Sequence, residues 1–435
     1  MSRLLSWFIT PRHRWPIVRQ RLIGFLLGGA FVAVYGYGFL GVDTVALDTA
    51  KVIRLIHSSY VKQITPEALR EQVLSGVTTQ VDRYARFMTA EENQAMQKDM
   101  NAEYVGIGVT VNEAPAGFVV RDVFAGSGAA EAGLRRGDLL LRAGKLDFAR
   151  RDVEHEVKLA AMKGEVGTLV TLAVRRDGQV FERQVTRKTV IFPSVRSDVF
   201  TYQNKHNAKR VGYFVIDEFK TQTDTELARQ LAAQIDRIDG LVLDLTGNPG
   251  GVLGVATRMA ELFLKRGDTL YWLVSRDNPD GEAVVANRDK TDAWREHLTL
   301  AQLAKLETLP MIVMVNGNSA SASELLSGAL QDNGRAKVFG AQTFGKGSVQ
   351  SIFDLPNGEA VTLTTARYLT PNRHTVEGVG IKPDYVPARK AARASFPDFD
   401  TDTFVDAFFN AKWLVQATAK LFEVDPVAAN NAVRP

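Results

Sequence analysis

The chain has 435 residues, enough for about two to four domains, and contains 45% hydrophobic and 23% charged residues, which excludes wholesale disorder, collagen-like repeats and a polytopic membrane protein. It has no cysteine, so disulfide scaffolds, thiolate metal sites and cysteine nucleophiles are excluded. The net charge of +4 arises in residues 1–42, which hold five arginines and no acidic residue, so nothing indicates a nucleic-acid partner.

The first predicted element is a transmembrane helix over residues 22–42. This stretch carries no charge, and a helix of its length would span about 30 Å, the thickness of a bilayer core. The basic segment 1–21 precedes it and Asp43 follows it, so the positive-inside rule puts the N-terminus in the cytoplasm and the body outside. A cleaved signal peptide and a buried core helix are the alternatives.

Residues 43–103 are predicted to be a helical region with two start signals. Thr65 precedes Pro66 as a helix cap, and Thr89 and Glu92 have the spacing of a capping box. Residues 104–190 then read as a small β-rich domain with a hairpin at Asp177-Gly178, interrupted by one helix over about 151–163.

Residues 191–390 alternate strand and helix patterns, which predicts a layered α/β core. The runs LVLDL (241–245) and MIVMV (311–315) are strongly apolar, as strands covered on both faces are. Each leads through a Gly- or Ser-rich turn to a helix, and ligands of open α/β sheets bind at such strand ends. The tail 391–435 is predicted to hold a packing helix over 403–421, with Phe404, Phe408, Ala411 and Val415 on one stripe.

The turn after MIVMV is the first candidate for chemistry. Small residues crowd the segment 316–323 at a strand-to-helix junction, so the hydroxyl of Ser321 would be exposed at a helix N-terminus. Free amides and the helix dipole there favour a developing oxyanion. An ordinary helix cap with small neighbours is the alternative.

A lysine returns to the same place. If the helix after Ser321 runs about 12 residues, the next strand brings Lys346 back near that serine. A lysine serves as general base only when burial lowers its pKa enough to leave it neutral. Gln350 could hydrogen-bond the amine. Residues 340–346 also fit part of a phosphate-binding loop, but Gly347 stands where that loop needs a hydroxyl, which argues against nucleotide binding.

A second turn, Thr246 to Gly251, could aim backbone amides into the same cleft, although a plain turn before a helix would look similar. The six histidines are scattered with no metal-like pair, so we expect no metal and no cofactor. A triad that uses one of these histidines stays open, because triads assemble through space.

Taken together, these segments resemble the carboxyl-terminal processing peptidases, tail-specific serine endopeptidases that carry a PDZ domain. The resemblance covers about residues 43–390, in the same order and spacing. It rests on VDRYARFMTAEE (81–92), YVGIGV (104–109), AGSGAAEAGLRRGDLLL (125–141), LDLTGNPGG (243–251), GNSASASELLSGALQDNGRA (317–336), TFGKGSVQ (343–350) and EGVGIKPDYVP (377–387). It implies an α/β peptidase core with an inserted PDZ-like domain.

The resemblance also implies residue roles. Ser321 would be the nucleophile, Lys346 the general base and Gln350 its support, with an oxyanion hole made by the amides of Ala322 and of Gly250 or Gly251. In the PDZ-like domain, the stretch Gly106, Ile107, Gly108 and Val109 would bind a substrate's terminal carboxylate while the tail adds as a strand.

Family members commonly act in the bacterial envelope on protein tails, and several form oligomers or use adaptor proteins. We therefore expect a single-pass protein of the bacterial inner membrane whose body faces the periplasm or cell exterior, with protein tails as substrates and an adaptor or a second copy as candidate partners. Two departures stand out: Thr246 replaces the family's usual arginine, and residues 391–435 match nothing. An inactive scaffold that binds protein C-termini is the alternative function.

Overall fold

The structure is a computed structural model that describes residues 44–203, 208–287, 296–387 and 410–422. The basic segment 1–21 and the predicted membrane helix 22–42 lie outside these residues. Within them, no helix combines the length and apolar character needed to cross a membrane. The chain divides after Val81 into two compact units.

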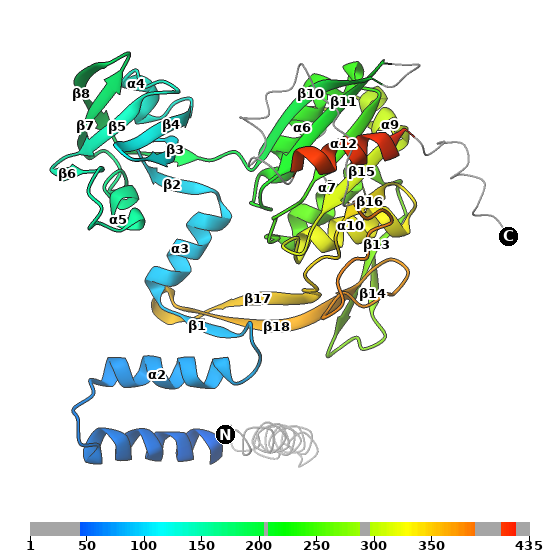
Figure 1. Ribbon diagram of the computed structural model, residues 1–435. Coiled ribbons are helices and arrows are strands. Elements are labelled where there is room, and N and C mark those ends of the chain that lie inside the picture. Colours follow the sequence, from blue (N-terminus) through cyan, green and yellow to red (C-terminus); the bar gives the residue numbers. More distant parts are fainter. Residues whose placement is uncertain (1–43, 204–207, 288–295, 388–409, 423–435) are drawn as a thin grey trace, which may run out of the picture. The chain divides into compact units, whose positions relative to one another are not determined.

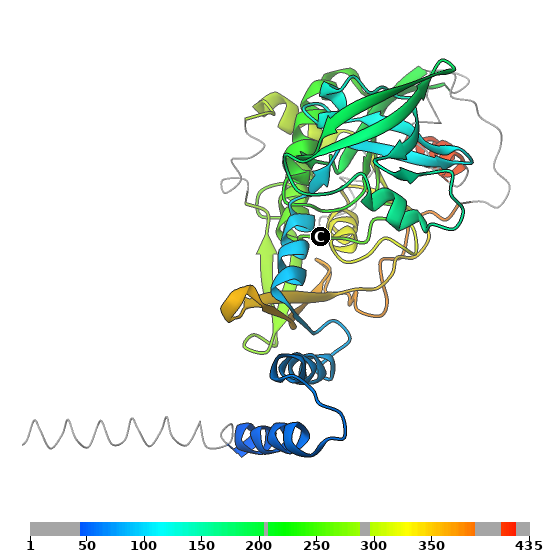
Figure 2. The same ribbon diagram turned by 90° about the vertical axis from the view of Figure 1, so that its left-hand side faces the viewer.

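The described part of the first unit, residues 44–81, holds two helices, over residues 44–59 and in α2 (Pro66–Thr79). The Thr65 side chain accepts a hydrogen bond from Ala68 N, and Pro66 occupies the first helical position, so the predicted start of α2 is confirmed. Figures 1 and 2 show the two helices side by side, and residues of both line a shared, mainly apolar pocket.

The second unit starts with a strand where the sequence predicts helix. Strand β1 (Arg86–Met88) pairs antiparallel with β18 (Ala360–Leu369), and Phe87 and Met88 are buried there. Pairing with a strand far along the chain outweighs local preference, so the predicted helical region 43–103 is interrupted here by a strand that the sequence does not predict. Helix α3 (Ala90–Met100) follows with the predicted Thr89–Glu92 capping box.

The β-rich domain is built on a six-stranded sheet in the order β3-β4-β5-β7-β8, with β6 paired to β5. Asp177 and Gly178 both have positive φ, as the two central residues of a type I′ hairpin turn do, which confirms the predicted hairpin. The helix expected over 151–163 is only α5 (His155–Ala160). The elements are β2 (Glu103–Gly106), β3 (Val109–Ala114), β4 (Gly117–Val123), α4 (Gly128–Glu131), β5 (Leu139–Ala143), β6 (Leu146–Asp147), β7 (Leu169–Arg176), β8 (Gln179–Thr186) and β9 (Lys188–Ile191), the last paired with β2.

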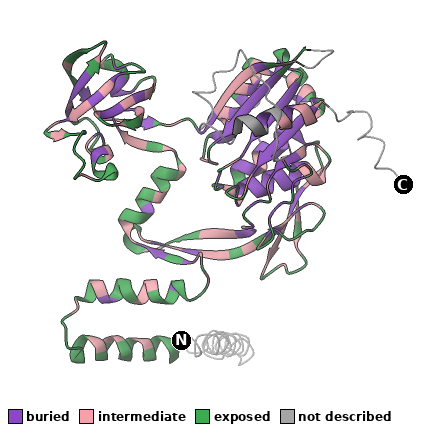
Figure 3. Ribbon diagram, in the orientation of Figure 1, coloured by how far each residue is buried: buried purple, intermediate pink, exposed green. Residues whose placement is uncertain are grey.

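The α/β core is a five-stranded sheet in the order β10-β11-β12-β15-β16, parallel except for β10. Every residue of β12 and β15 is buried, as Figure 3 shows, which confirms the expectation of strands covered on both faces. The elements are β10 (Val195–Gln203), β11 (Ala208–Ile216), α6 (Thr223–Gln234), β12 (Gly240–Asp244), α7 (Leu253–Phe263), α9 (Leu300–Thr308), β15 (Met311–Val315), α10 (Ala322–Asp332) and β16 (Lys337–Gly340).

Two apolar clusters cover this sheet, one on each face. Leu241 and Leu243 join the cluster that includes α7 and α10, whereas Val242 points to the cluster that includes α12 (Asn410–Leu421). Helix α12 contacts β12, β15 and β16 and crosses that face in Figure 1. The predicted helix over 403–421 is thus seen from Asn410 on. Of the predicted apolar stripe, Phe404 and Phe408 lie outside the described residues, and the side chains of Ala411 and Val415 are not described.

A second sheet completes the core in the order β1-β18-β13-β14, with β17 paired to β18. Its remaining strands are β13 (Thr269–Ser275), β14 (Glu282–Val285) and β17 (Ser348–Asp354). Strand β17 begins two residues after Lys346. Its pairing with β18 therefore fixes the position of the loop that carries this lysine.

Candidate active site

Ser321 immediately precedes α10 and has an unusual backbone conformation. Its φ is 54° and its ψ is −112°, where a helix cap is ordinarily extended. A non-glycine residue with positive φ is strained and persists only when its surroundings hold it. The turn before it is fixed by Ser319, whose hydroxyl donates to Leu245 O at 2.7 Å and accepts from Asn316 N at 2.9 Å.

Asn248 joins the glycine-rich turn after β12 to the serine segment. Its side chain is fully buried, donates to Ile216 O at 2.7 Å and accepts from Gly250 N at 2.8 Å. Its backbone oxygen accepts from Ala320 N and from the Ser323 hydroxyl, each at 3.0 Å. The two turns that the sequence singled out therefore form one structure.

Gly250 lies directly against the serine. Its φ is +105°, and a Cβ built on it would stand 2.8 Å from Ser321 Cβ and 3.0 Å from Ala322 N. Ala322 is the first residue of α10, so its amide has no acceptor within the helix. Gly251 and Phe219 form a parallel β-bridge. Its two hydrogen bonds run from Phe219 N to Gly250 O and from Val252 N to Phe219 O, so the amide of Gly251 itself points away from Phe219.

The Glu324 side chain joins the backbone of Lys346 to that of Ser321. Lys346 N and Ser321 N each donate to the same oxygen, Glu324 Oε2, at 2.8 Å. The Lys346 amine lies 4.7 Å from the centre of the Tyr84 ring. Among the residues that the structure describes, no hydrogen bond joins this amine, or any histidine, to Ser321 Oγ.

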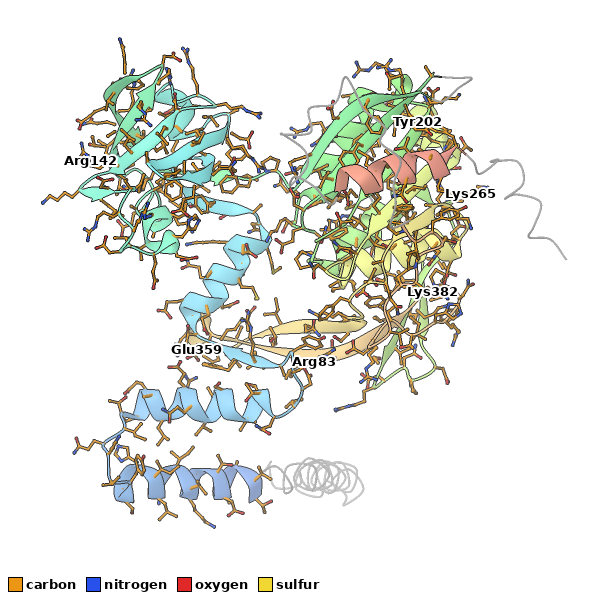
Figure 4. The ribbon with its side chains drawn as sticks, in the orientation of Figure 1. Arg83, Arg142, Tyr202, Lys265, Glu359 and Lys382 are labelled. Atoms are coloured by element: carbon orange, nitrogen blue, oxygen red, sulfur yellow. The ribbon has the colours of Figure 1, made fainter. Side chains whose placement is uncertain are left out.

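The surroundings of Lys346 lower the pKa of its amine. Burial lowers the pKa of the amine below its ordinary value, the carboxylate of Glu377 opposes this, and the charge of Arg83 reinforces it. Arg83 Nη2 and Glu377 Oε1 form an ion pair at 2.8 Å, so their effects on the lysine partly cancel. Arg83 is labelled beside β1 and β18 in Figure 4.

Two predicted features have local partners of their own. Gln350 Nε2 donates to Ser348 Oγ at 3.0 Å and to Thr364 Oγ1 at 3.2 Å. Neither bond is to the Lys346 amine, which the sequence predicts as its partner. Thr246, which replaces an expected arginine, donates its amide to Asp244 Oδ1 at 2.8 Å. The buried Asp244 also accepts the Tyr213 hydroxyl, so it anchors this end of the turn.

Comparisons with known proteins fit this geometry. Residues 210–386 match the model of peptidase family S41, and residues 104–186 match a PDZ domain. A CtpA-like serine protease of Staphylococcus aureus (strain bovine RF122 / ET3-1) is 30% identical over 382 residues, which cover 85% of this chain and 72% of that protein. The chain belongs to peptidase family S41. It is an S41 serine peptidase with a PDZ domain, similar to CtpA-like serine proteases, and the predicted family is confirmed.

Two further relatives extend this picture of the S41 protease. A CtpA-like serine protease of Staphylococcus epidermidis RP62A is 30% identical over 335 residues, which cover 77% of this chain and 63% of that protein. The crystal structure of a Bacteroides fragilis NCTC 9343 protein described as an S41 protease is 16% identical, with a TM-score of 0.50, and the match covers 86% of this chain and 97% of that one. This second likeness shows a shared fold.

In the PDZ domain of this S41 protease, Gly106 ends β2 and Val109 begins β3, with the buried Ile107 between them. Gly108 has a φ of +81°, and a Cβ built on it would lie 2.2 Å from Ser127 Cβ. Strand β3 ends the order of the sheet, and Lys158 of α5 donates to Glu113 of β3 at 3.3 Å. An edge strand beside a helix is where an added peptide strand can bind.

Three residues near the S41 site were assigned no role from the sequence. Glu324 carried an available signal, because Ser321 and Glu324 have capping-box spacing. Tyr84 belongs to a quoted family segment, but its contact with Lys346 joins distant parts of the chain. Tyr368 lies 47 residues beyond Ser321 and its contact with that residue has no local sequence signal.

Proposed function

We propose that this S41 protease cleaves proteins near or at their C-termini with Ser321 as nucleophile and Lys346 as general base. The observation that carries the proposal is the shared carboxylate oxygen: Ser321 N and Lys346 N bind Glu324 Oε2, each at 2.8 Å. The strained Ser321 backbone at a helix N-terminus and the lowered pKa of the Lys346 amine support the same roles.

In the proposed mechanism, the neutral Lys346 amine leaves the Tyr84 ring by side-chain rotation and takes the proton of Ser321 Oγ. The oxygen attacks the peptide carbonyl carbon, the lysine returns the proton to the leaving amine, and an acyl-enzyme ester remains. Lys346 then takes a proton from water, whose oxygen attacks the ester, and the second product leaves as Ser321 regains a proton.

The oxyanion is proposed to bind the amides of Ala322 and Gly251. The Gly250 amide is already engaged by Asn248, which favours Gly251 as the second donor, while Gly250 gives the turn its close approach to the serine. Gln350 is proposed to support the lysine loop through Ser348, to which it donates.

Recognition of the substrate is assigned to the PDZ domain. The amides of the stretch 106–109 would bind the terminal carboxylate of a protein tail, and the tail would extend along the edge strand β3. Residues 22–42 are proposed to anchor the protein in a bacterial inner membrane, with the catalytic body facing the periplasm or cell exterior. The uncharged length of this stretch and the five arginines before it support that orientation.

The proposal is tested with the full-length chain in detergent and an unstructured protein as substrate. We expect Ser321→Ala and Lys346→Ala each to reduce cleavage by at least about 1,000-fold. Matched control variants, Ser351→Ala on β17 and Lys337→Ala on β16, should cleave at the rate of the unmodified protein. Equal rates for all five proteins would end the proposal.

A further inference from the structure

Glu324 is a fully buried carboxylate whose hydrogen bonds all lead to the serine and lysine segments. Besides Ser321 N and Lys346 N on Oε2, its Oε1 accepts from the Thr343 hydroxyl at 2.5 Å and from Gly345 N at 2.6 Å. The group accepts four hydrogen bonds, which requires the lone pairs of both oxygens.

Tyr368 makes the complementary connection on the carbonyl side. Its hydroxyl lies 2.8 Å from Ser321 O and 2.9 Å from Lys346 O, so one proton is shared between the two carbonyls. The side chain is buried, and burial together with the charges of Glu324 and Glu377 raises the pKa of the hydroxyl well above its ordinary value. The hydroxyl therefore stays a donor throughout the working range of a protease.

We propose that Glu324 and Tyr368 are positioning residues that brace the peptide unit of Ser321 against that of Lys346. Ser321 and Lys346 are each held at both ends: Glu324 accepts a hydrogen bond from the amide, and Tyr368 donates to the carbonyl. The separation of nucleophile and base is thus set by two rigid side chains. This inference rests on the proposed roles of Ser321 and Lys346.

The brace also explains how Ser321 keeps its strained backbone. The φ of 54° at Ser321 is held by two hydrogen bonds, one from its amide to Glu324 and one from the Tyr368 hydroxyl to its carbonyl. A glutamine at position 324 has one oxygen in place of two, so its amide group would face two of the four donors. One pair of contacts would be lost and the lysine loop would shift relative to the serine.

The test compares Glu324→Gln and Tyr368→Phe with the unmodified full-length protein. A shift of about 1 Å between reacting groups costs about 100-fold in rate. We expect Glu324→Gln to lower kcat about 100-fold and Tyr368→Phe about 10-fold, each with KM within about twofold. The pH at which kcat reaches half its maximum should also move, because the lysine amine occupies a new environment.

Asp224→Asn serves as the matched control. Asp224 is equally buried, bonds to Arg258 between α6 and α7, and contacts neither segment of the brace. This variant should lower the melting temperature while kcat and its pH dependence stay unchanged. Should Glu324→Gln fail to fold, Tyr368→Phe, which keeps the buried ring, decides the matter.

Loss of kcat with a displaced pH profile in Tyr368→Phe supports the brace. Unchanged kcat and pH profile in the folded variants, with Ser321→Ala inactive alongside, overturn the brace and leave the proposed function standing. Activity retained by Ser321→Ala overturns both.

Discussion

Replacing Gly250 by alanine tests whether the glycine-rich turn must touch the nucleophile. The added Cβ would lie 2.8 Å from Ser321 Cβ, whereas ordinary contact begins at 3.4 Å. The two atoms must therefore separate by more than half an ångström. Because the Asn248 side chain ties the Gly250 amide to Ile216 O, we expect much of that displacement to fall on Ser321.

The cost has two parts. A side chain at positive φ costs about 1–2 kcal/mol, and forcing an extra carbon into a packed site costs about 1–3 kcal/mol more. The unfolding free energy should thus fall by roughly 2–5 kcal/mol in Gly250→Ala. Displacing the nucleophile by this distance should lower kcat/KM by about 10- to 100-fold.

Gly247→Ala is the matched control. Gly247 also has positive φ, at +79°, but nothing lies within 4 Å of the Cβ built on it. It should show only the backbone cost of about 1–2 kcal/mol and keep its kcat/KM. Chemical denaturation and initial rates of cleavage measure both quantities. If the two variants lose stability and activity equally, the contact with Ser321 is not what demands glycine at position 250.

Two further predictions concern the lysine and the PDZ domain. The carboxylate of Glu377 raises the pKa of Lys346, and the charge of Arg83 lowers it. The rising limb of kcat/KM against pH should therefore move to lower pH in Glu377→Gln and to higher pH in Arg83→Gln. Movement of the limb in the same direction in both variants would contradict this assignment. In the PDZ domain, Gly108→Val should weaken binding of a peptide with a free C-terminus by at least about tenfold in fluorescence anisotropy. Gly126→Ala, where a Cβ meets nothing within 4 Å, should bind normally, and normal binding by Gly108→Val would show that the loop is not used.

The parts of the fold that local chemistry determines are predictable from sequence. The caps at Thr65 and Thr89 and the turn at Asp177-Gly178 depend on neighbours within a few residues, and all three are confirmed. Strand β1 was missed because its partner, β18, lies far along the chain and only pairing with it makes the segment extended.

The site divides in the same way. Ser321 and Lys346 follow from motif context, and the strand and helix lengths between them predict that the chain returns to one place. What holds them there is not predictable, because Tyr368 and Tyr84 reach the site only through tertiary packing. The sequence predicts that Gln350 binds the Lys346 amine. In the structure, the pairing of β17 with β18 shifts register between Val349 and Gln350, and the Gln350 side chain bonds to Ser348 and Thr364.

The most direct test of the account is the pH dependence of acylation at Ser321. A serine-reactive fluorophosphonate probe is applied to the full-length protein and to Lys346→Ala, and the labelled peptide is identified by mass spectrometry. We predict a single adduct at Ser321, formed faster as the lysine amine loses its proton at a pH below that of an ordinary lysine, and slow labelling without this pH dependence in Lys346→Ala. An adduct at another residue, or equally fast labelling with the same pH profile in Lys346→Ala, would contradict the account.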